Sequence, residues 1–240
     1  MQNKVKIFKN PGELAKDAAL NFKSLTKVKK SGNFNVLLSG GNTPVLLFEY
    51  IREHLLKEFK WEHIHFFWGD ERCVPSDHPD SNYGNANTIL LKYLDIPTSS
   101  IHPIIGETHP YLEADRYSKI IHDHFEEKEN VPVFDLVFLG LGADGHVASL
   151  FPGQDMIFHS NRLFEVTIHP ETGQNRITAT SKLINQATNI YFLVAGEKKA
   201  FVLNRIINKV KGFEKYPASG IIPVNGKLTW FVDKAAATYL

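Results

Sequence analysis

The chain has little that could stabilise it covalently or anchor it in a membrane. Cys73 is the single cysteine among 240 residues, so no disulfide can form within the chain. A lone thiol is typical of a reducing compartment, and we expect a cytoplasmic protein. No apolar run approaches the ~18 residues that a membrane span needs, and the first residues include no apolar segment of signal-peptide length. The sequence therefore predicts neither a disulfide-rich secreted domain nor a membrane protein.

A surplus of charge of either sign is also missing. Lys and Arg total 27 and Asp and Glu total 26, which gives a formal net charge of +1. Nucleic-acid binding needs a strong basic surplus, so we expect no nucleic-acid partner, whereas a local basic pocket for a small anion is compatible with this balance. Hydrophobic residues make up 43% of the chain, enough for a sizeable core. With no repeat or linker, we expect one domain over residues 1–240 and no obligate protein partner.

Strand-like and helix-like segments alternate along the chain. Apolar runs predict strands at Val36–Leu38, His63–Trp68, Val133–Leu139 and Ile190–Val194, and helical spacing predicts a helix at Pro11–Val28. The alternation is typical of an α/β fold with a doubly wound, mostly parallel, Rossmann-like sheet and helices on both faces. Such sheets bind ligands outside the carboxyl ends of their strands. Gly-rich or charged segments follow three of the strands, so we expect these segments to converge on one crevice.

The first of these segments is SGGNTP, from Ser39 to Pro44. Gly40 and Gly41 can adopt backbone conformations closed to other residues, and a helix predicted to begin at Thr43 directs N–H groups and a partial positive charge at the loop. A phosphate is the simplest ligand for such a loop. No Gly-Lys-Ser/Thr follows, so this is not a Walker loop, and a tight turn without a ligand is the alternative.

Charged side chains directly follow the next strand, at Asp70, Glu71 and Arg72. Arg72 can bind a phosphate or carboxylate through two hydrogen bonds, and the two carboxylates can accept hydrogen bonds from sugar hydroxyls. A solvated turn with a local ion pair is the alternative. The neighbouring Cys73 has no evident partner base, so we expect it to behave as a small hydrophobic residue rather than as an activated thiol.

The third segment, GLGADGH, follows the most apolar predicted strand. Gly140, Gly142 and Gly145 match the G-x-G-x-x-G pattern of dinucleotide-binding sites. That fingerprint also requires a helix to open at this point, but Pro152 and Gly153 interrupt the chain within a few residues. We therefore expect no nicotinamide cofactor here.

His146, at the end of this segment, is the candidate catalytic base. Histidine changes its charge near physiological pH, so a neutral imidazole can take a proton from water. A nearby carboxylate can fix the tautomer of such a ring, and either Asp144 or Asp70 could do so here. A histidine in a surface turn is the alternative.

Several other polar residues have less distinctive positions. His63 and His65 share a predicted strand, and His122 and His124 share a predicted helix. None of these pairs has the spacing of a zinc site with a third ligand, so we expect no metal. Lys199 lies at the start of a predicted helix, where a cation is unfavourable unless an anion is bound, and an exposed first turn is the alternative.

Together these motifs resemble the signature stretches of the 6-phosphogluconolactonase family. SGGNTP, DERCVPSDHPDSNYGNAN and GLGADGHVASLFPG follow one another in the order of that family. RIT at Arg176–Thr178 and GEKKA at Gly196–Ala200 resemble two later stretches. The similarity extends from about residue 5 to the last helix. Ala143 and Val147 stand where proline and threonine are usual, and neither touches a proposed reacting group.

The resemblance implies a fold shared with glucosamine-6-phosphate deaminases and ribose-5-phosphate isomerases. It also implies hydrolysis of a small-molecule sugar-phosphate lactone, 6-phospho-D-glucono-1,5-lactone, in the oxidative pentose phosphate pathway, with no cofactor and no metal. His146 matches the catalytic histidine of the family, with Asp144 and Asp70 as its candidate neighbours. The candidate substrate-binding residues are Gly40, Gly41, Asn42, Thr43, Glu71, Arg72, Arg176 and Lys199.

Two alternative functions are compatible with the same motifs. One is a glucosamine-6-phosphate deaminase or isomerase, in which the related stretch reads DGHIAFNEPG with a catalytic glutamate before the Pro-Gly. Phe151 occupies that place here, which favours the simpler lactone hydrolysis. The other is a non-catalytic sugar-phosphate sensor, which usually carries a DNA-binding or partner domain for which we expect no spare residues.

Overall fold

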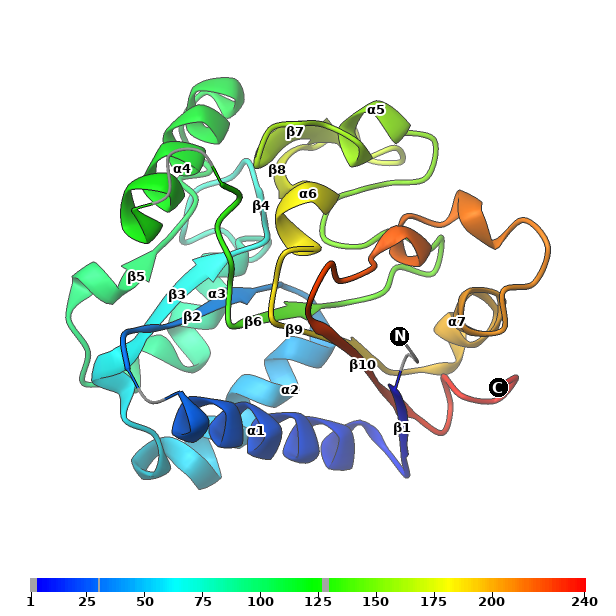
Figure 1. Ribbon diagram of the computed structural model, residues 1–240, viewed down its shortest axis with the longest axis horizontal. Helices are drawn as coiled ribbons and strands as arrows, with labels where there is room; N and C mark the ends of the chain where they lie inside the picture. The colour runs from blue at the N-terminus through cyan, green and yellow to red at the C-terminus, as the bar shows by residue number, and fades with distance from the viewer. Residues whose placement is uncertain (1–3, 30, 127–129) are drawn as a thin grey trace.

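The computed structural model describes residues 4–29, 31–126 and 130–240, so residues 1–3 of the N-terminal segment discussed above lie outside the described residues. Its larger sheet has seven strands in the order β1-β10-β9-β6-β2-β3-β5, and every neighbouring pair is parallel (Figure 1). The strands are β1 (Lys4–Phe8), β2 (Phe34–Leu38), β3 (Ile64–Trp68), β5 (Ile101–His102), β6 (Leu136–Leu139), β9 (Asn189–Val194) and β10 (Lys227–Asp233). This arrangement confirms the predicted α/β fold.

The central strands are buried on both faces, as expected for a parallel sheet between layers. All residues of β2 and β6 are buried. The predicted strand Val133–Leu139 is shortened to Leu136–Leu139 because Asp135 has a polar role. Its carboxylate pairs with the Lys29 Nζ at 2.6 Å and accepts the Asn35 backbone N–H at 2.8 Å.

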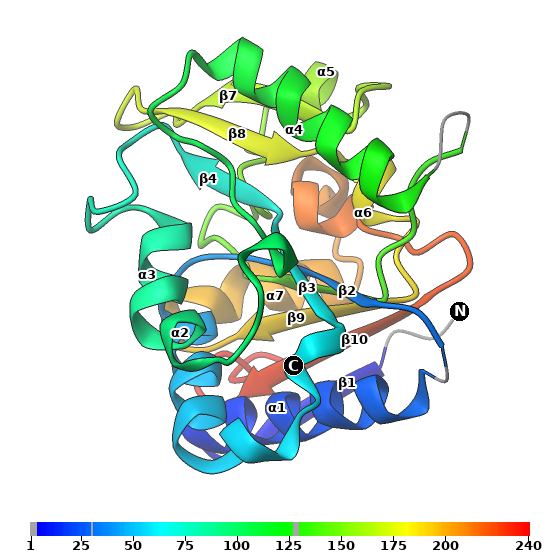
Figure 2. The same ribbon diagram turned by 90° about the vertical axis from the view of Figure 1, so that its left-hand side faces the viewer.

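Helices lie on both faces of the large sheet (Figure 2). α1 (Pro11–Val28) and α2 (Asn42–Tyr50) pack together against one face. The Asn10 side chain accepts the Glu13 backbone N–H at 2.9 Å and so caps α1. Phe22 of α1 contacts Phe138 of β6 edge-on, with ring centroids 5.7 Å apart. The other face is covered by α4 (Pro110–Phe125), by α6 (Ser181–Ile184) and by a second sheet.

The second sheet is antiparallel, with strand order β4-β8-β7, and the sequence pattern did not predict it as a separate unit. It consists of β4 (Asp70–Arg72), β7 (Phe164–Ile168) and β8 (Asn175–Ala179). Gly69 forms the junction between the two sheets. Its N–H donates to the Leu38 carbonyl of the large sheet at 2.7 Å, and its carbonyl accepts the Ala179 N–H of the small sheet at 2.7 Å. The chain therefore passes from β3 directly into β4.

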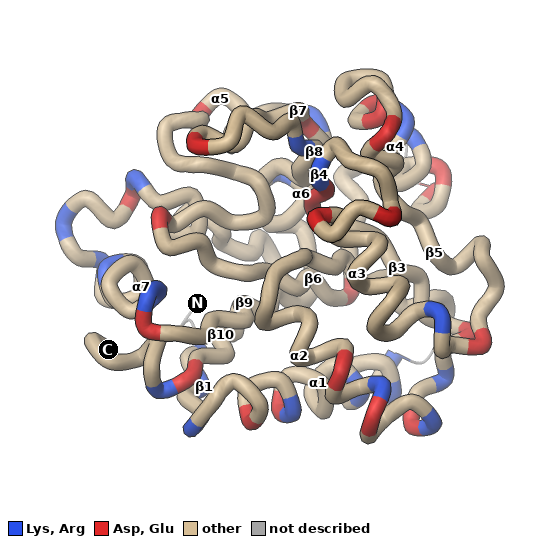
Figure 3. Tube along the Cα trace, turned by 180° about the vertical axis from the view of Figure 1, so that it is seen from behind, with Lys and Arg blue, Asp and Glu red and all other residues tan. Residues whose placement is uncertain are grey.

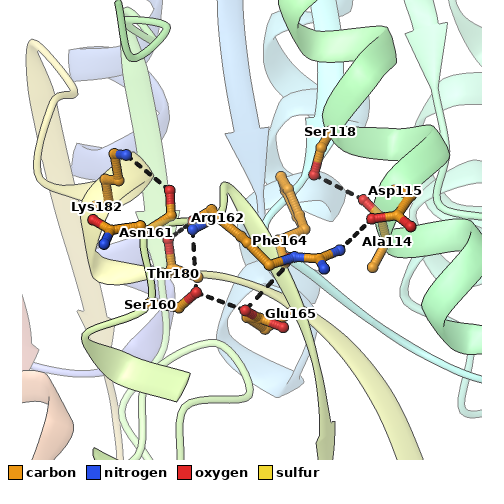
Figure 4. A network of polar contacts seen from close by, with 10 residues as sticks. All are labelled: Ala114, Asp115, Ser118, Ser160, Asn161, Arg162, Phe164, Glu165, Thr180 and Lys182. Carbon is orange, nitrogen blue, oxygen red and sulfur yellow. Dashed lines mark hydrogen bonds and ion pairs between the residues drawn. The ribbon is translucent and has the colours of Figure 1, made fainter. Parts of the chain in front are cut away.

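A polar network connects this second sheet to α4 (Figure 4). Arg162, which precedes β7, forms ion pairs with Asp115 of α4 and with Glu165 of β7. The Ser160 hydroxyl donates to Glu165 at 2.6 Å, and the Thr180 hydroxyl donates to the Arg162 carbonyl at 2.7 Å. The network holds the small sheet beside α4, over the large sheet.

The remaining helices are short. They are α3 (Asn82–Ile89), α5 (Asp155–Phe158) and α7 (Ala200–Ile207). Among the described residues, no helix has both the length and the apolar character required to cross a membrane.

Candidate active site

A pocket of about 250 Å³ lies where β2, β6 and β9 of the large sheet end, with the small sheet at its side. The predicted convergence of the three segments on one crevice is confirmed, and Arg176 and Lys199 join them. The lining residues are Ser39, Gly40, Gly41, Asn42, Thr43, Pro44, Asp70, Arg72, Asn82, Gly140, Leu141, Gly142, His146, Ala148, Arg176, Leu193, Val194, Ala195 and Lys199.

The loop between β2 and α2 forms one wall of the pocket. Gly41 has φ of +99°, a conformation that favours glycine, and no side chain caps the helix that begins after it. Gly40 is required for a different reason, because a Cβ there would lie 1.7 Å from the Asn82 Oδ1. The uncapped N-terminus of α2 therefore presents backbone N–H groups and a partial positive charge at the pocket, as an anion site requires.

Two guanidinium groups face the pocket from the small sheet. Arg72 of β4 and Arg176 of β8 are directly opposite partners in the antiparallel ladder, so basic positions on the two strands lie side by side (Figure 3). Like charges in such a pair destabilise a sheet. The buried Nε atoms of Arg72 and Arg176 have no hydrogen-bond partner among the described residues. The nearby Asp70 and Asp80 favour the charge of Arg176, and an anionic ligand would supply the missing acceptor together with a further countercharge.

Lys199 adds a third cation from the turn before α7. Burial lowers the pKa of its ammonium group, and the nearby Lys198 lowers it further, whereas Asp144 acts in the opposite direction. A bound anion would favour the charged form of this half-buried lysine.

His146 lies on the loop after β6, opposite an acidic neighbour. Its Nδ1 is 2.7 Å from the Asp144 Oδ1, and its backbone N–H donates to the same oxygen at 3.2 Å. Burial raises the pKa of Asp144, but the hydrogen bond and charge of His146 outweigh this, so the net pKa is lowered. An ionised Asp144 can accept the Nδ1–H of the ring, and in that tautomer the lone pair lies on Nε2.

The other carboxylate considered for this role has different partners. Asp70 is buried, and its Oδ2 accepts the Ser149 hydroxyl at 2.7 Å. The Asn82 amide donates to the Asp70 carbonyl at 2.8 Å. Asp70 therefore lines the pocket in a fixed position, while Asp144 is the carboxylate hydrogen-bonded to the His146 ring.

The loop that carries His146 folds back on itself. The Gly142 N–H donates to the His146 carbonyl at 2.9 Å, and Val147 and Leu150 form a bridge. Ala148 adopts a left-handed φ of +50°, which is uncommon for a residue with a side chain. No helix opens in this segment, so its glycines lack the structural context of a dinucleotide fingerprint.

Glu71 is the predicted substrate-binding residue that the structure places elsewhere. It is only 1% exposed and does not line the pocket. Its carboxylate instead accepts the backbone N–H groups of Asn82 and Tyr83, each at 2.7 Å, and so holds the start of α3. Burial raises the pKa of Glu71 to about 7, although these hydrogen bonds lower it. The geometry therefore gives no support to the expected contact with sugar hydroxyls, because both oxygens accept hydrogen bonds from the protein interior.

Cys73 matches the expectation of a small hydrophobic residue. It packs against the core, and burial raises the pKa of its thiol to about 11, with the charges of Glu71 and Glu113 adding to the shift. A thiol of this kind is protonated at neutral pH and is a poor nucleophile.

Asn82 and Ser149 were not among the predicted site residues. Asn82 lines the pocket at the first position of α3. Ser149 contacts two strands of the small sheet, because its hydroxyl donates to Asp70 of β4 and its N–H donates to the Thr178 hydroxyl of β8 at 3.1 Å. Ser81, immediately before Asn82, caps α3, and its hydroxyl accepts the Gly84 N–H at 3.0 Å. That capping pattern was the available signal for Asn82, because it places this residue at a helix start beside Asp70.

Comparison with known proteins identifies the family. The family model for glucosamine-6-phosphate isomerases and 6-phosphogluconolactonase matches residues 9–230. A 6-phosphogluconolactonase of Haemophilus influenzae is 42% identical over 209 residues, covering 86% of this chain and 87% of that protein. A 6-phosphogluconolactonase of Synechocystis is 41% identical over 215 residues, covering 89% and 87%.

Solved structures agree with this assignment. The 6-phosphogluconolactonase from Trypanosoma cruzi superposes with a TM-score of 0.89 at 30% identity, over 100% of this chain and 98% of that chain. A monomeric glucosamine-6-phosphate deaminase has a TM-score of 0.83 at 22% identity, over 99% and 100%, which is a likeness of fold alone. The chain therefore belongs to the family of glucosamine-6-phosphate isomerases and 6-phosphogluconolactonases.

Proposed function

We propose that this protein hydrolyses 6-phospho-D-glucono-1,5-lactone to 6-phospho-D-gluconate. The observation that carries the proposal is one pocket lined by His146, whose ring is hydrogen-bonded to Asp144, and by Arg72 and Arg176, whose buried Nε atoms have no partner among the described residues. A base at one position and an anion site at another are what the hydrolysis of a phosphorylated lactone requires. The curated relatives at about 40% identity bear the name of this activity.

The phosphate binds at the N-terminus of α2 and to the basic side chains. The loop Gly40–Thr43 supplies N–H groups, and Arg176 and Lys199 supply positive charge. These contacts are remote from the carbon that reacts, so they hold the lactone carbonyl in place near His146. Asp70 lies beside the sugar ring, where its fixed carboxylate accepts hydrogen bonds from hydroxyl groups.

His146 acts as the general base. Its Nε2 takes a proton from a water molecule, and the water oxygen forms a bond to the lactone carbonyl carbon. Loop N–H groups or Arg72 stabilise the tetrahedral oxyanion, and one such donor is worth about 3–4 kcal/mol. The bond between that carbon and the ring oxygen then breaks, and the proton passes from His146 to the ring oxygen, leaving a hydroxyl group and a carboxylic acid that ionises.

Deamination or isomerisation of an amino sugar phosphate is the second candidate function, and Phe151 is the residue that disfavours it. The residue is 2% exposed and packs 5.0 Å from the His146 ring, and the Arg176 guanidinium lies over it at 5.7 Å. Phe151 holds these two groups in position but cannot transfer protons. An aldose-ketose conversion needs proton transfer at two carbons, whereas lactone hydrolysis needs one activated water.

The activity places the protein at the second step of the oxidative pentose phosphate pathway, and we propose the cytoplasm as its location. A coupled assay tests the function, in which the lactone is generated in situ and 6-phosphogluconate is followed with and without the protein. We expect formation well above the spontaneous rate. Product formation at only the spontaneous rate would refute the proposal, and ammonia release from glucosamine 6-phosphate would identify the alternative. Tight binding of 6-phosphogluconate without turnover would indicate a sensor.

A further inference from the structure

Three histidines that are separated in the sequence lie together at the β5 edge of the large sheet. His65 lies on β3, His102 on β5 and His124 in the last turn of α4. One ring nitrogen of each lies within 4.8 Å of those of the other two. His65 is five residues before Asp70 on nearly continuous strands, about 16 Å of extended chain, so this cluster is distinct from the active site.

The spacing of the ring nitrogens can be compared with that around a bound metal ion. The His65 Nδ1 and the His102 Nε2 share a hydrogen bond of 3.1 Å, which a bound ion would replace. Two ligands of a tetrahedral zinc ion with bonds of about 2.0–2.1 Å are themselves about 3.3 Å apart. The largest separation in the cluster, 4.8 Å, exceeds this value by about 1.5 Å, which small movements of half-buried side chains can close.

The surroundings hold the three rings in position. The Phe67 ring stacks on His102 at a centroid distance of 4.2 Å and contacts His124 edge-on at 5.0 Å. The Asn35 Oδ1 lies 2.8 Å from the His124 Nε2, and a hydrogen bond of this kind fixes the orientation of a metal-binding imidazole. The fold thus brings the three rings together before any ion binds, and binding requires only the small movements described above.

The rings also have the protonation state that metal binding requires. Burial and the neighbouring histidines lower the pKa of His65 and His102 to about 4. Burial alone lowers the pKa of His124. Neutral rings retain a lone pair at neutral pH, so an ion displaces few protons when it binds.

We propose that His65, His102 and His124 form a binding site for one first-row transition metal ion, with Zn²⁺ as the representative and water as the fourth ligand. Three imidazoles suit Zn²⁺, Co²⁺, Ni²⁺ or Cu²⁺, whereas Mg²⁺ and Ca²⁺ prefer oxygen ligands. This proposal departs from the expectation of no metal, which was based on histidine spacing along the chain and therefore could not include His102.

A metal ion at this site would stabilise the position of β5, the shortest strand of the large sheet. β5 has two residues and pairs with β3 through two residue pairs. A metal ion would join β3, β5 and α4, and it would stabilise the native state because the ligands come together only on folding. At a free ion concentration about 100 times the Kd, we expect the Tm to rise by roughly 5–10 °C.

The experiment uses the full chain, purified without a histidine tag and treated with a chelator. Co²⁺ is titrated while the visible absorption of tetrahedral cobalt is followed, and Zn²⁺ is titrated by calorimetry and by thermal unfolding. We expect one ion per chain. The variants His102→Gln and His124→Gln should each weaken binding by at least about tenfold, the minimum loss found even for outer-shell partners. His63→Gln, an exposed histidine immediately before β3, is the matched control and should bind as the wild type does.

Several outcomes would overturn the proposal. One is the absence of stoichiometric binding to the wild-type chain. Another is binding that survives both His102→Gln and His124→Gln in variants that retain the wild-type circular dichroism. A third is binding that is lost in His146→Gln, which would assign the ion to the active-site pocket. Because the test measures metal binding, it is independent of lactone hydrolysis.

Discussion

Gly142→Ala tests whether the His146–Asp144 pair performs catalysis. A Cβ at Gly142 would lie 2.2 Å from the His146 Nδ1 and 2.4 Å from the Asp144 Oδ1. Unbonded atoms pack at about 3.5–4.0 Å, so the two side chains must each move by at least about 1 Å. Their hydrogen bond of 2.7 Å cannot survive this movement, although both side chains remain in the protein.

The expected loss follows from the strength of that bond. A hydrogen bond to a charged group contributes about 1.5–3 kcal/mol, which corresponds to roughly 10- to 150-fold in rate. The Asp144 side chain is 45% exposed, and solvent screening therefore favours the lower end of this range. The phosphate contacts lie on other segments, so the variant should lose kcat and retain its affinity for 6-phosphogluconate.

Gly69→Ala is the matched control for this variant. It makes the same change beside the pocket, but the nearest atom to its Cβ would be the Leu38 carbonyl oxygen at 3.4 Å, an ordinary contact. The lactone assay gives kcat and KM for both variants, and calorimetry gives the affinity for product. If the kcat of Gly142→Ala lies within about twofold of that of the wild type and of Gly69→Ala, the His146–Asp144 hydrogen bond is not needed for catalysis. A twofold change in rate corresponds to less than about 0.5 kcal/mol of activation free energy.

Three further predictions follow from the site. Arg176→Ala should weaken binding of the phosphorylated lactone by about tenfold or more and leave an unphosphorylated lactone unaffected, and an equal loss on both substrates would contradict its role. The lowered pKa of Lys199 means that its charge is lost at a lower pH than that of a free lysine, so the affinity for 6-phosphogluconate should fall as the pH rises toward 10. Lys199→Arg should abolish that fall in calorimetric titrations at several pH values. Glu71→Gln should lower the unfolding free energy by roughly 1.5–3 kcal/mol and the Tm by about 3–12 °C, because an amide cannot satisfy all the N–H groups that the carboxylate accepts, and an unchanged thermal transition would refute this.

The large sheet was predictable because its strands are apolar and alternate with helices. Val36–Leu38 and Ile190–Val194 needed only small extensions at their ends. One strand of the small sheet, β4, was not predictable in the same way. β4 is three charged residues long, and it becomes a strand because Gly69 redirects the chain toward β8. A local pattern does not contain that partner.

The candidate site was also predictable only in part. Features that depend on neighbouring residues were predictable, whereas features that depend on distant elements were not. The loop Gly40–Thr43 and His146 could be recognised locally as candidates, whereas the choice between Asp144 and Asp70 as the partner of the His146 ring needed the structure. The burial of Glu71 could not be predicted because it depends on α3, which folds over it. The three-histidine cluster was missed because its members lie on different elements and meet only in the folded chain.

The pairing of Arg72 with Arg176 connects the fold to substrate selection. The antiparallel register of β4 and β8 places two like charges opposite each other, and their buried Nε atoms have no acceptor among the described residues. Both features are unfavourable for the stability of the protein. A phosphate group offsets both costs, whereas a neutral lactone offers an acceptor but no countercharge. The geometry that weakens the small sheet therefore favours ligands that carry a phosphate group.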